Sequence, residues 1–446
     1  MKLKRIAFYL GAGLCLGAGS LHAQGAPDYE QPPVSYSETP STDALVVLQQ
    51  RIAAGELAFA GRDREVLKTL LDALGVPVAS QMLIFSKTSL QRGRIRPDQP
   101  RALYFADSAY VGWVPGGLME VAAIDPQLGP VFYAFDSSAI RHQGPKIVRD
   151  GDCLRCHGGT FVRDIPGVFA RSVFSDGNGE PLLRHGTQIV EDDTPFDQRW
   201  GGWYVTGYHG KEPHRGNAFA SERGDELVFA PAEQRPDELS AFFNPSEYLR
   251  PTSDVVALMV CEHQMAMQNS LTRAAFMGRK MIAYQHGLQK TFKEPETDEP
   301  TYDSVKSVFA SAVQDVIDRL LFRNAAPLPA GVDGSAEFRK TFAAGAPRSA
   351  AGHALKDLQL KDRIFSQRCS YLIYSASFRA LPVTLKVRIL DRLQAALRSR
   401  DPKDRYAYLG AEEKQRIYDI LIETHPDARE RWRGGDAAGK SASTRW

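Results

Sequence analysis

The stretch ALYFADSAYVGWV at residues 102–114, followed by MEVAAIDPQLGPVFYAFD at 119–136, decides the fold class. Both segments are rich in aromatic and β-branched residues and are bounded by turn signals, a pattern typical of short paired strands. VFARSVFSDGNGEPLLRHG at 168–186 and GGWYVTGYHG at 201–210 continue this pattern. The DGNG sequence at 176–179 predicts a hairpin turn, because Gly and Asn adopt positive φ at little cost. We therefore expect an antiparallel sheet in this region.

Helical patterns flank the strand-rich region on both sides. Apolar residues recur at helical spacing between 44 and 99 and again between 355 and 430. A long helix is expected with Thr252 or Ser253 as its N-cap and Asp254 in its first turn. The expected fold is α+β, with an antiparallel sheet region followed by a mainly helical C-terminal region.

Composition divides the 446-residue chain further. Pro, Ser and Thr dominate the stretch before residue 44, which is typical of a flexible leader, and Ala, Gly and Pro dominate 324–354, which predicts a linker. The expected order is a signal peptide (1–23), a flexible leader (24–43), an N-terminal helical segment (44–99), an α+β domain (100–290), a helix and linker (291–354), a C-terminal helical region (355–430) and a disordered tail (431–446).

The first 23 residues have the pattern of a secretory signal peptide. Lys2, Lys4 and Arg5 precede an apolar run at 6–19, and small residues follow. The run is short for a membrane anchor of ~20 residues, and no later segment has a long uninterrupted apolar run. Removal of the three positive charges takes the formal net charge from +2 to −1, which gives no electrostatic basis for binding nucleic acid. We expect a mature protein without a membrane span in a bacterial periplasm.

The sequence DGDCLRCHGG at 151–160 contains the pattern C-x-x-C-H, the attachment signature of c-type haem. Two thiols at this spacing can add to the two vinyl groups on one edge of the macrocycle, and the adjacent imidazole can then reach the iron from one face. Cys153 and Cys156 would tether the haem, and His157 would bind its iron.

A zinc site and a redox-active disulfide are the alternatives to haem at this cluster. A tetrahedral zinc site needs four ligands, but the next cysteine is Cys261 and there is no second C-x-x-C. A redox-active C-x-x-C of the thioredoxin type is expected within a βαβ unit, whereas this cluster lies among predicted antiparallel strands.

The second axial ligand of such a haem is not determined by the motif. Small cytochromes c take a downstream Met, but residues 158–258 contain none. The helix after residue 254 places His263 and Met267 one turn apart on an apolar stripe, with Met265 pointing elsewhere. His263 is either an iron ligand or a core histidine bonded to a neighbouring group, and Met267 is a further candidate.

Two other histidines compete with these residues. His209 and His214, in GYHGKEPHRGN, follow the predicted hairpin and would face either the iron or a substrate pocket. If no ligand is supplied, the iron is five-coordinate and can bind a small molecule.

Other side chains around the cluster have two interpretations each. Arginines suit the haem propionates but are equally expected in solvent; those close in sequence are Arg155, Arg163, Arg171 and Arg199. Aromatic residues could wall the haem or form sheet core; these are Trp200, Trp203 and Tyr204. Cys261 and Cys369 are either a disulfide or two buried thiols.

Several stretches resemble an uncharacterised family of exported bacterial monohaem c-type cytochromes. They are CLRCHGG, PGVFARSVFSDGNGEPL, RWGGWYVTGYHG, HRGN, SDVVALMVCEHQ and RCSYLIYSASFRALP, and they extend over most of residues 100–400. The resemblance implies haem binding and electron transfer, with Cys153 and Cys156 as tethers and His157 as iron ligand. It implies no catalytic residue.

The function expected from the sequence is that of an exported cytochrome with one covalently attached haem c, exchanging electrons with a periplasmic redox partner. One alternative is a peroxidase-like haem oxidoreductase that uses His209, His214 or His263 as distal acid or base. Another is a periplasmic haem-based sensor with an open distal site, which would need a separate transducer because no output domain follows.

Overall fold

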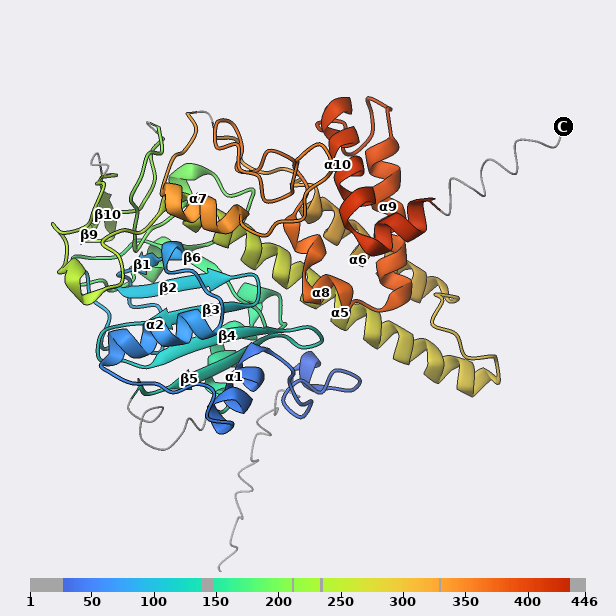
Figure 1. The fold of residues 1–446 in the computed structure, drawn as a ribbon, viewed down its shortest axis with the longest axis horizontal. Coiled ribbons are helices and arrows are strands. Elements are labelled where there is room, and N and C mark those ends of the chain that lie inside the picture. Colours follow the sequence, from blue (N-terminus) through green and yellow to red (C-terminus); the bar gives the residue numbers. More distant parts are fainter. Residues whose placement is uncertain (1–26, 138–146, 211, 233–235, 329, 434–446) are drawn as a thin grey trace, which may run out of the picture.

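The computed structural model describes residues 27–137, 147–210, 212–232, 236–328 and 330–433 (Figure 1). The signal peptide expected at 1–23 and most of the tail expected at 431–446 lie outside these ranges. Among the described residues, no helix combines the length and the apolar character that crossing a membrane requires.

A six-stranded antiparallel sheet forms the first half of the molecule. Its strand order is β5-β4-β3-β2-β1-β8. The strands are β1 (Met82–Ile84), β2 (Arg101–Ala106), β3 (Ala109–Trp113), β4 (Met119–Asp125), β5 (Gly129–Phe135) and β8 (Trp203–Tyr204). Two strand pairs lie outside this sheet, β6 (Ala170–Val173) with β7 (Thr187–Val190) and β9 (Ala220–Arg223) with β10 (Glu226–Phe229).

The two faces of the large sheet pack against different helices. Side chains such as Tyr104 and Val111 belong to a core with α1 (Ala44–Ala53) and α2 (Asp63–Ala73). Tyr110 and Phe132 point to the opposite face, whose core includes the first half of α5 (Val255–Phe292). Successive residues of a strand point to opposite faces of the sheet, while cross-strand partners lie on the same face. The partners Leu103 with Gly112, and Ala122 with Phe132, therefore show which residues share each face.

Helix α5 connects the sheet to the C-terminal region. It runs along the sheet and then on to the remaining helices (Figure 1). Its N-cap is Asp254, whose carboxylate accepts a hydrogen bond from Ala257 N at 2.9 Å. The expected caps are therefore wrong. Thr252 does not cap this helix, and Ser253 Oγ instead donates to Tyr204 O at 2.7 Å and accepts from Leu83 N at 2.9 Å.

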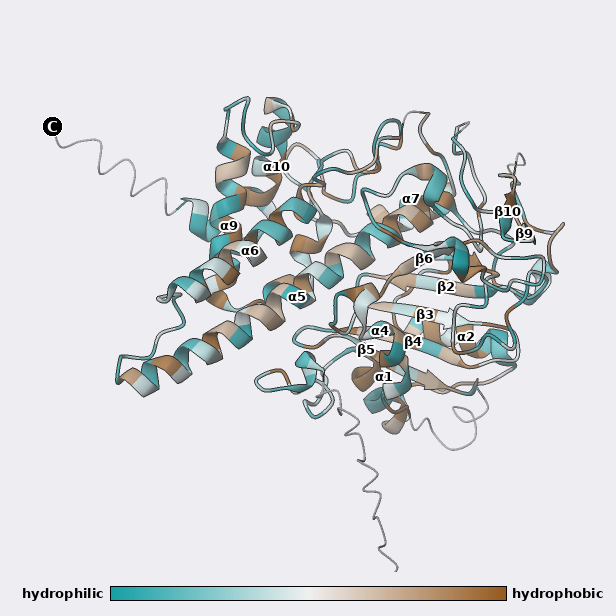
Figure 2. Ribbon diagram, turned by 180° about the vertical axis from the view of Figure 1, so that it is seen from behind, coloured by the Kyte–Doolittle hydropathy of each residue, from teal (hydrophilic) through white to brown (hydrophobic). Residues whose placement is uncertain are grey.

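The C-terminal half is mainly helical, which together with the sheet confirms the expected α+β class. Its helices are α6 (Asp303–Leu320), α7 (Ala336–Ala343), α8 (Ala376–Arg379), α9 (Val383–Arg398) and α10 (Ala411–Thr424). Hydrophobic and hydrophilic residues alternate around α9 and α10 (Figure 2). Residues of α5, α6, α9 and α10 share one hydrophobic core with the inner sheet face, so no clean domain boundary falls at residue 290.

Two segments expected to be loose are packed. In the expected flexible leader, Tyr29, Val34 and Tyr36 are buried, and Tyr36 Oη donates to Pro130 O at 2.7 Å. The expected linker contains α7, whose Phe338 is buried against the core. Buried aromatic residues therefore anchor both segments despite their composition.

Candidate functional site

A cavity lies between the inner face of the sheet and the segment that contains the C-x-x-C-H sequence. Its empty space, about 1060 Å³, includes the part that is open to solvent. The sheet contributes Leu103, Tyr110, Ala122 and Phe132 to one wall. The opposite wall contains Cys153, Cys156 and His157, which lie on a 3₁₀ turn (Gly151–Cys153) that leads into the one-turn helix α4 (Leu154–His157). The three residues of the predicted haem motif therefore face one cavity.

The imidazole of His157 is fixed in one orientation. Its Nδ1 lies 2.9 Å from Gly167 O, while Gly167 N donates to His157 O at 2.8 Å. Because a carbonyl oxygen can only accept, Nδ1 carries the proton and Nε2 keeps its lone pair. The ring packs between Phe132 and Phe169, with centroid distances of 4.8 and 4.9 Å. Burial lowers the pKa of His157, so the ring stays neutral and suited to bind a metal.

The two cysteines of the cluster are free thiols in different surroundings. Cys156 is exposed, whereas Cys153 is half-buried. Burial, followed by the nearby Asp150 carboxylate, raises the pKa of Cys153 to about 12. This environment disfavours a thiolate at Cys153. Redox-active C-x-x-C cysteines have lowered pKa values instead, so the site does not resemble theirs. A thioether carries no charge and is compatible with this environment.

The part of the chain that the structure describes contains no set of ligands for a zinc ion. No group of three or more His, Cys, Asp or Glu side chains there is arranged to hold a metal ion. Four such ligands are usual for structural zinc. A tethered haem needs only one protein ligand besides its two thioethers, and His157 meets that requirement.

Helix α5 holds the loop that orients His157. Asn269 Nδ2 donates to Val168 O at 2.7 Å, and Val168 N donates to Asn269 Oδ1 at 3.0 Å. The preceding Gly167 has no room for a side chain, because a Cβ there would lie 2.8 Å from Asn269 Oδ1. No pattern in the sequence indicated this role for Asn269.

A charged pair lies in the cavity wall formed by the sheet. Arg101 Nη2 is 2.5 Å from Glu120 Oε2, and each side chain is only 17% exposed. Arg101 Nε is buried without a hydrogen-bond partner among the described residues. Gly112 makes room for this pair, since a Cβ there would overlap the guanidinium of Arg101. The sheet wall of the cavity thus combines apolar side chains with one partly satisfied ion pair.

Only one of the four arginines suggested by the sequence reaches the cavity. Arg171 lines it, with its Nε donating to Thr187 Oγ1 at 2.6 Å. Arg155 is exposed. Arg163 lies 3.9 Å from Glu191 and 3.7 Å from Asp315, and Arg199 forms a buried pair with Glu262 at 2.6 Å. Arg171 and Arg101 are therefore the guanidinium groups available to a ligand here.

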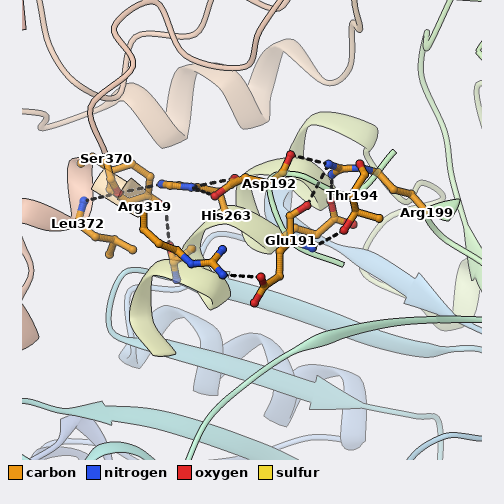
Figure 3. Close-up of polar contacts among 11 residues, drawn as sticks. Glu191, Asp192, Thr194, Arg199, His263, Arg319, Ser370 and Leu372 are labelled. Atoms are coloured by element: carbon orange, nitrogen blue, oxygen red, sulfur yellow. Dashed lines mark hydrogen bonds and ion pairs between the residues drawn. The ribbon is translucent and has the colours of Figure 1, made fainter. Parts of the chain in front are cut away.

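His263 lies in a different part of the core. Its ring is buried and stacks on Phe322 at 4.2 Å. Its Nδ1 lies 3.0 Å from Asp192 Oδ1, and its Nε2 lies 2.8 Å from Ser370 Oγ (Figure 3). Both ring nitrogens are therefore engaged, and His263 does not line the cavity at Cys153.

The order Asp192, His263, Ser370 has the distances of a nucleophile triad. Ser370 is nevertheless fully buried, and its Oγ also accepts a hydrogen bond from Leu372 N at 3.3 Å as the cap of a 3₁₀ helix (Tyr371–Tyr374). A substrate cannot reach this hydroxyl. The arrangement joins α5 to the segments before and after it in the chain.

The apolar stripe predicted on this helix contained His263 and Met267 and excluded Met265. This prediction is wrong for the cavity. Met267 is fully buried and does not line the cavity, whereas Met265 does. The first part of α5, from 255 to 268, is buried on every side. Because such a helix has no single apolar stripe, burial does not identify which face meets the cavity.

The remaining candidates lie outside the cavity or only partly at it. His209 and His214 are buried with their Nε2 atoms 3.2 Å apart, away from Cys153. Trp203 lines the cavity, while Trp200 and Tyr204 belong to the core. Cys261 and Cys369 are free and buried, so the disulfide that the sequence allowed is not formed.

Comparison with known proteins identifies no relative. No family model, no curated protein and no solved structure matches the chain. The function must therefore be inferred from the cavity and from the residues that line it.

Proposed function

We propose that the protein is a c-type cytochrome with one haem in the cavity at Cys153. Cys156 and Cys153 would hold it through two thioether bonds, and His157 would bind the iron through Nε2. The orientation of His157 carries this proposal, because its Nδ1 is tied to Gly167 O and the residue lines the cavity that both cysteines share. Haem, when bound, supplies one-electron redox chemistry.

The surroundings suit the two chemically different parts of a haem. The apolar wall of Leu103, Ala122 and Phe132 would cover the macrocycle and exclude water. Arg171 and Arg101 could pair with propionates, which bind guanidinium groups in bidentate fashion. The exposed position of Cys156 would leave the tethered edge near solvent. We infer that the function is electron transfer through that edge with a periplasmic redox partner of the exported protein.

The experiment is maturation in a host that attaches haem c. The expected product is red, keeps its haem after denaturation and has the mass of the chain plus one haem. The double variant Cys153→Ser/Cys156→Ser should lose covalent haem, whereas Cys261→Ala, which removes a buried thiol outside the cavity, should keep it. A colourless wild-type protein at the mass of the bare chain would overturn the proposal.

One observation favours a second function, a haem oxidoreductase or a sensor with an open site. The Arg101–Glu120 pair places an acid–base group and a cation in the cavity, which a simple electron carrier does not need. His209, His214 and His263 do not line this cavity and so do not supply a distal acid or base. If this function holds, the reduced protein binds carbon monoxide, and Glu120→Gln lowers peroxide turnover without loss of haem.

A further inference from the structure

Besides His157 and the cysteines, several side chains in the cavity lining carry a possible donor to iron. The Glu120 carboxylate is paired with Arg101, and the Tyr133 hydroxyl donates to Asp43. The hydroxyl of Tyr110 and the thioether of Met265 remain. Gln264 Nε2 donates to Tyr110 Oη at 3.0 Å, and burial raises the pKa of Tyr110 well above its ordinary value. A phenol that keeps its proton is a poor iron ligand. The thioether is neutral and needs no such ionisation.

We infer that Met265 is the second axial ligand of the haem iron. This inference rests on the proposed function and names a ligand that the C-x-x-C-H sequence leaves open. Met265 is 6% exposed and lines the cavity from α5, a different element from the α4 turn that bears His157. A thioether is a soft, polarizable donor that suits an apolar cavity.

Neighbouring side chains fix the turn of α5 that bears Met265. Gln264 Nε2 donates to Ala106 O at 2.8 Å, and Gln264 Oε1 accepts from Tyr371 Oη at 2.7 Å. One turn later, Asn269 pairs with the backbone of Val168. The position of Met265 is therefore set by the fold, and no rearrangement of the helix is needed to present it.

Helix geometry separates Met265 from the other two candidates on α5. Each residue advances about 100° around the axis, so residues two positions apart differ by about 200°. His263 and Met267 each lie two positions from Met265 and therefore point to other parts of the core, where His263 meets Asp192 and Ser370. Asn269, four positions after Met265, lies on the same face and reaches Val168 beside the cavity.

The experiment uses the full-length protein with covalent haem confirmed by mass. The wild type should contain six-coordinate low-spin iron, with the far-red absorption band of a thioether bound to ferric iron, and should not bind carbon monoxide when reduced. Met265→Ala should lose that band and gain carbon monoxide binding. Met265→His should stay low-spin, lose the band and have a lower reduction potential, because thioether ligation raises the potential.

Met267→Ala is the matched control. It truncates a buried methionine on the same helix that does not line the cavity, so the band should persist even if stability falls. Covalent haem with no thioether band in the wild type, or a Met265→Ala spectrum equal to wild type, would overturn the inference alone. Failure to attach haem at all would overturn the proposed function, and this inference with it.

Discussion

Asn269 pairs with Val168 through both polar groups of its side-chain amide, which receives the Val168 N–H and donates to the Val168 carbonyl. The residue before Val168 is Gly167, whose carbonyl accepts from Nδ1 of His157. The same helix therefore bears Met265 and secures the loop that orients His157. The orientation of His157 and the position of α5 are therefore coupled through this one amide.

Replacement of Asn269 by Ala should disturb the proposed haem site and lower stability together. Val168 N and O are left without their partner, which costs about 1–3 kcal/mol of unfolding free energy. Because the loop is released, the orientation of His157 should become heterogeneous, and the ferric spectrum should show a mixture of spin states. Visible absorption and urea unfolding of the holoprotein measure the two effects.

Gln268→Ala is the matched control for this prediction. Gln268 is the neighbouring buried amide on α5, but its side chain bonds to Ser377 Oγ at 2.9 Å, away from the cavity. It should lose a similar amount of stability and keep the wild-type spectrum. Equal spectral changes in both variants would show that Asn269 acts only through general stability.

Gly158→Ala should destabilise the protein through a contact with the N-terminal segment. A Cβ at Gly158 would overlap Tyr29 Oη, and it would lie 2.9 Å from Leu154 O. Forcing an extra carbon into such a site costs about 1–3 kcal/mol. Tyr29→Phe removes the overlapping hydroxyl, so the double variant should recover part of the loss in thermal unfolding. Strict additivity of the two changes would refute a packed Tyr29 at this position.

The strands at 101–135 could be predicted because each alternates or runs apolar between clear turn signals. β1 could not, since it has three residues, whereas the strand-like stretch at 201–210 contains the two-residue β8 but did not show where that strand pairs. Strands of two or three residues are too short to show an alternation of apolar and polar side chains. Their place in the sheet is set by long-range pairing, such as Leu83 with Tyr204. These two short strands complete the sheet on the side where Trp203 meets the cavity.

The grouping of Cys153, Cys156 and His157 could be predicted from the sequence because the three residues lie within five consecutive positions. The rest of the cavity comes from segments far apart in the chain, so no local pattern unites Arg101, Glu120 and Met265. One signal was present. Arg101 and Glu120 occupy the same inward-facing alternation as Leu103 and Ala122, and a charge at an inward position of a strand marks a functional or paired group.

Replacement of His263 should affect stability rather than the iron. His263→Ala leaves Asp192 buried without its partner, which costs about 3–5 kcal/mol. Ser370→Ala removes the hydrogen bonds of Ser370 Oγ to His263 Nε2 and Leu372 N and should cost about 1–3 kcal/mol. The haem spectrum should stay unchanged in both variants. A change of spin state in His263→Ala, with native far-ultraviolet circular dichroism, would instead support His263 as an iron ligand.

The same site predicts the acid stability of the protein. Burial alone would raise the pKa of Asp192, but the charge and hydrogen bond of His263, with Arg319 and Arg199, hold it below its ordinary value. A carboxyl with a depressed pKa stabilises the fold above its unfolded pKa, and that stability is lost as the pH falls through the folded pKa. In His263→Ala, burial should raise the pKa of Asp192. Urea unfolding at decreasing pH should then show the acid loss of stability beginning at a higher pH than in wild type.

Thiol counting tests the cofactor attachment and the core together. Burial raises the pKa of Cys369 to about 12 and that of Cys261 well above its ordinary value, and both are buried. Neither should react with iodoacetamide in the native holoprotein, because alkylation requires an accessible thiolate. After the proposed holoprotein is unfolded without reductant, these two thiols alone should be alkylated, since Cys153 and Cys156 would be blocked as thioethers. Mass spectrometry of the peptides identifies which cysteines are alkylated. Alkylation at all four positions would mean that no haem is attached, and alkylation at neither core cysteine until a reductant is added would mean that they form a disulfide after all.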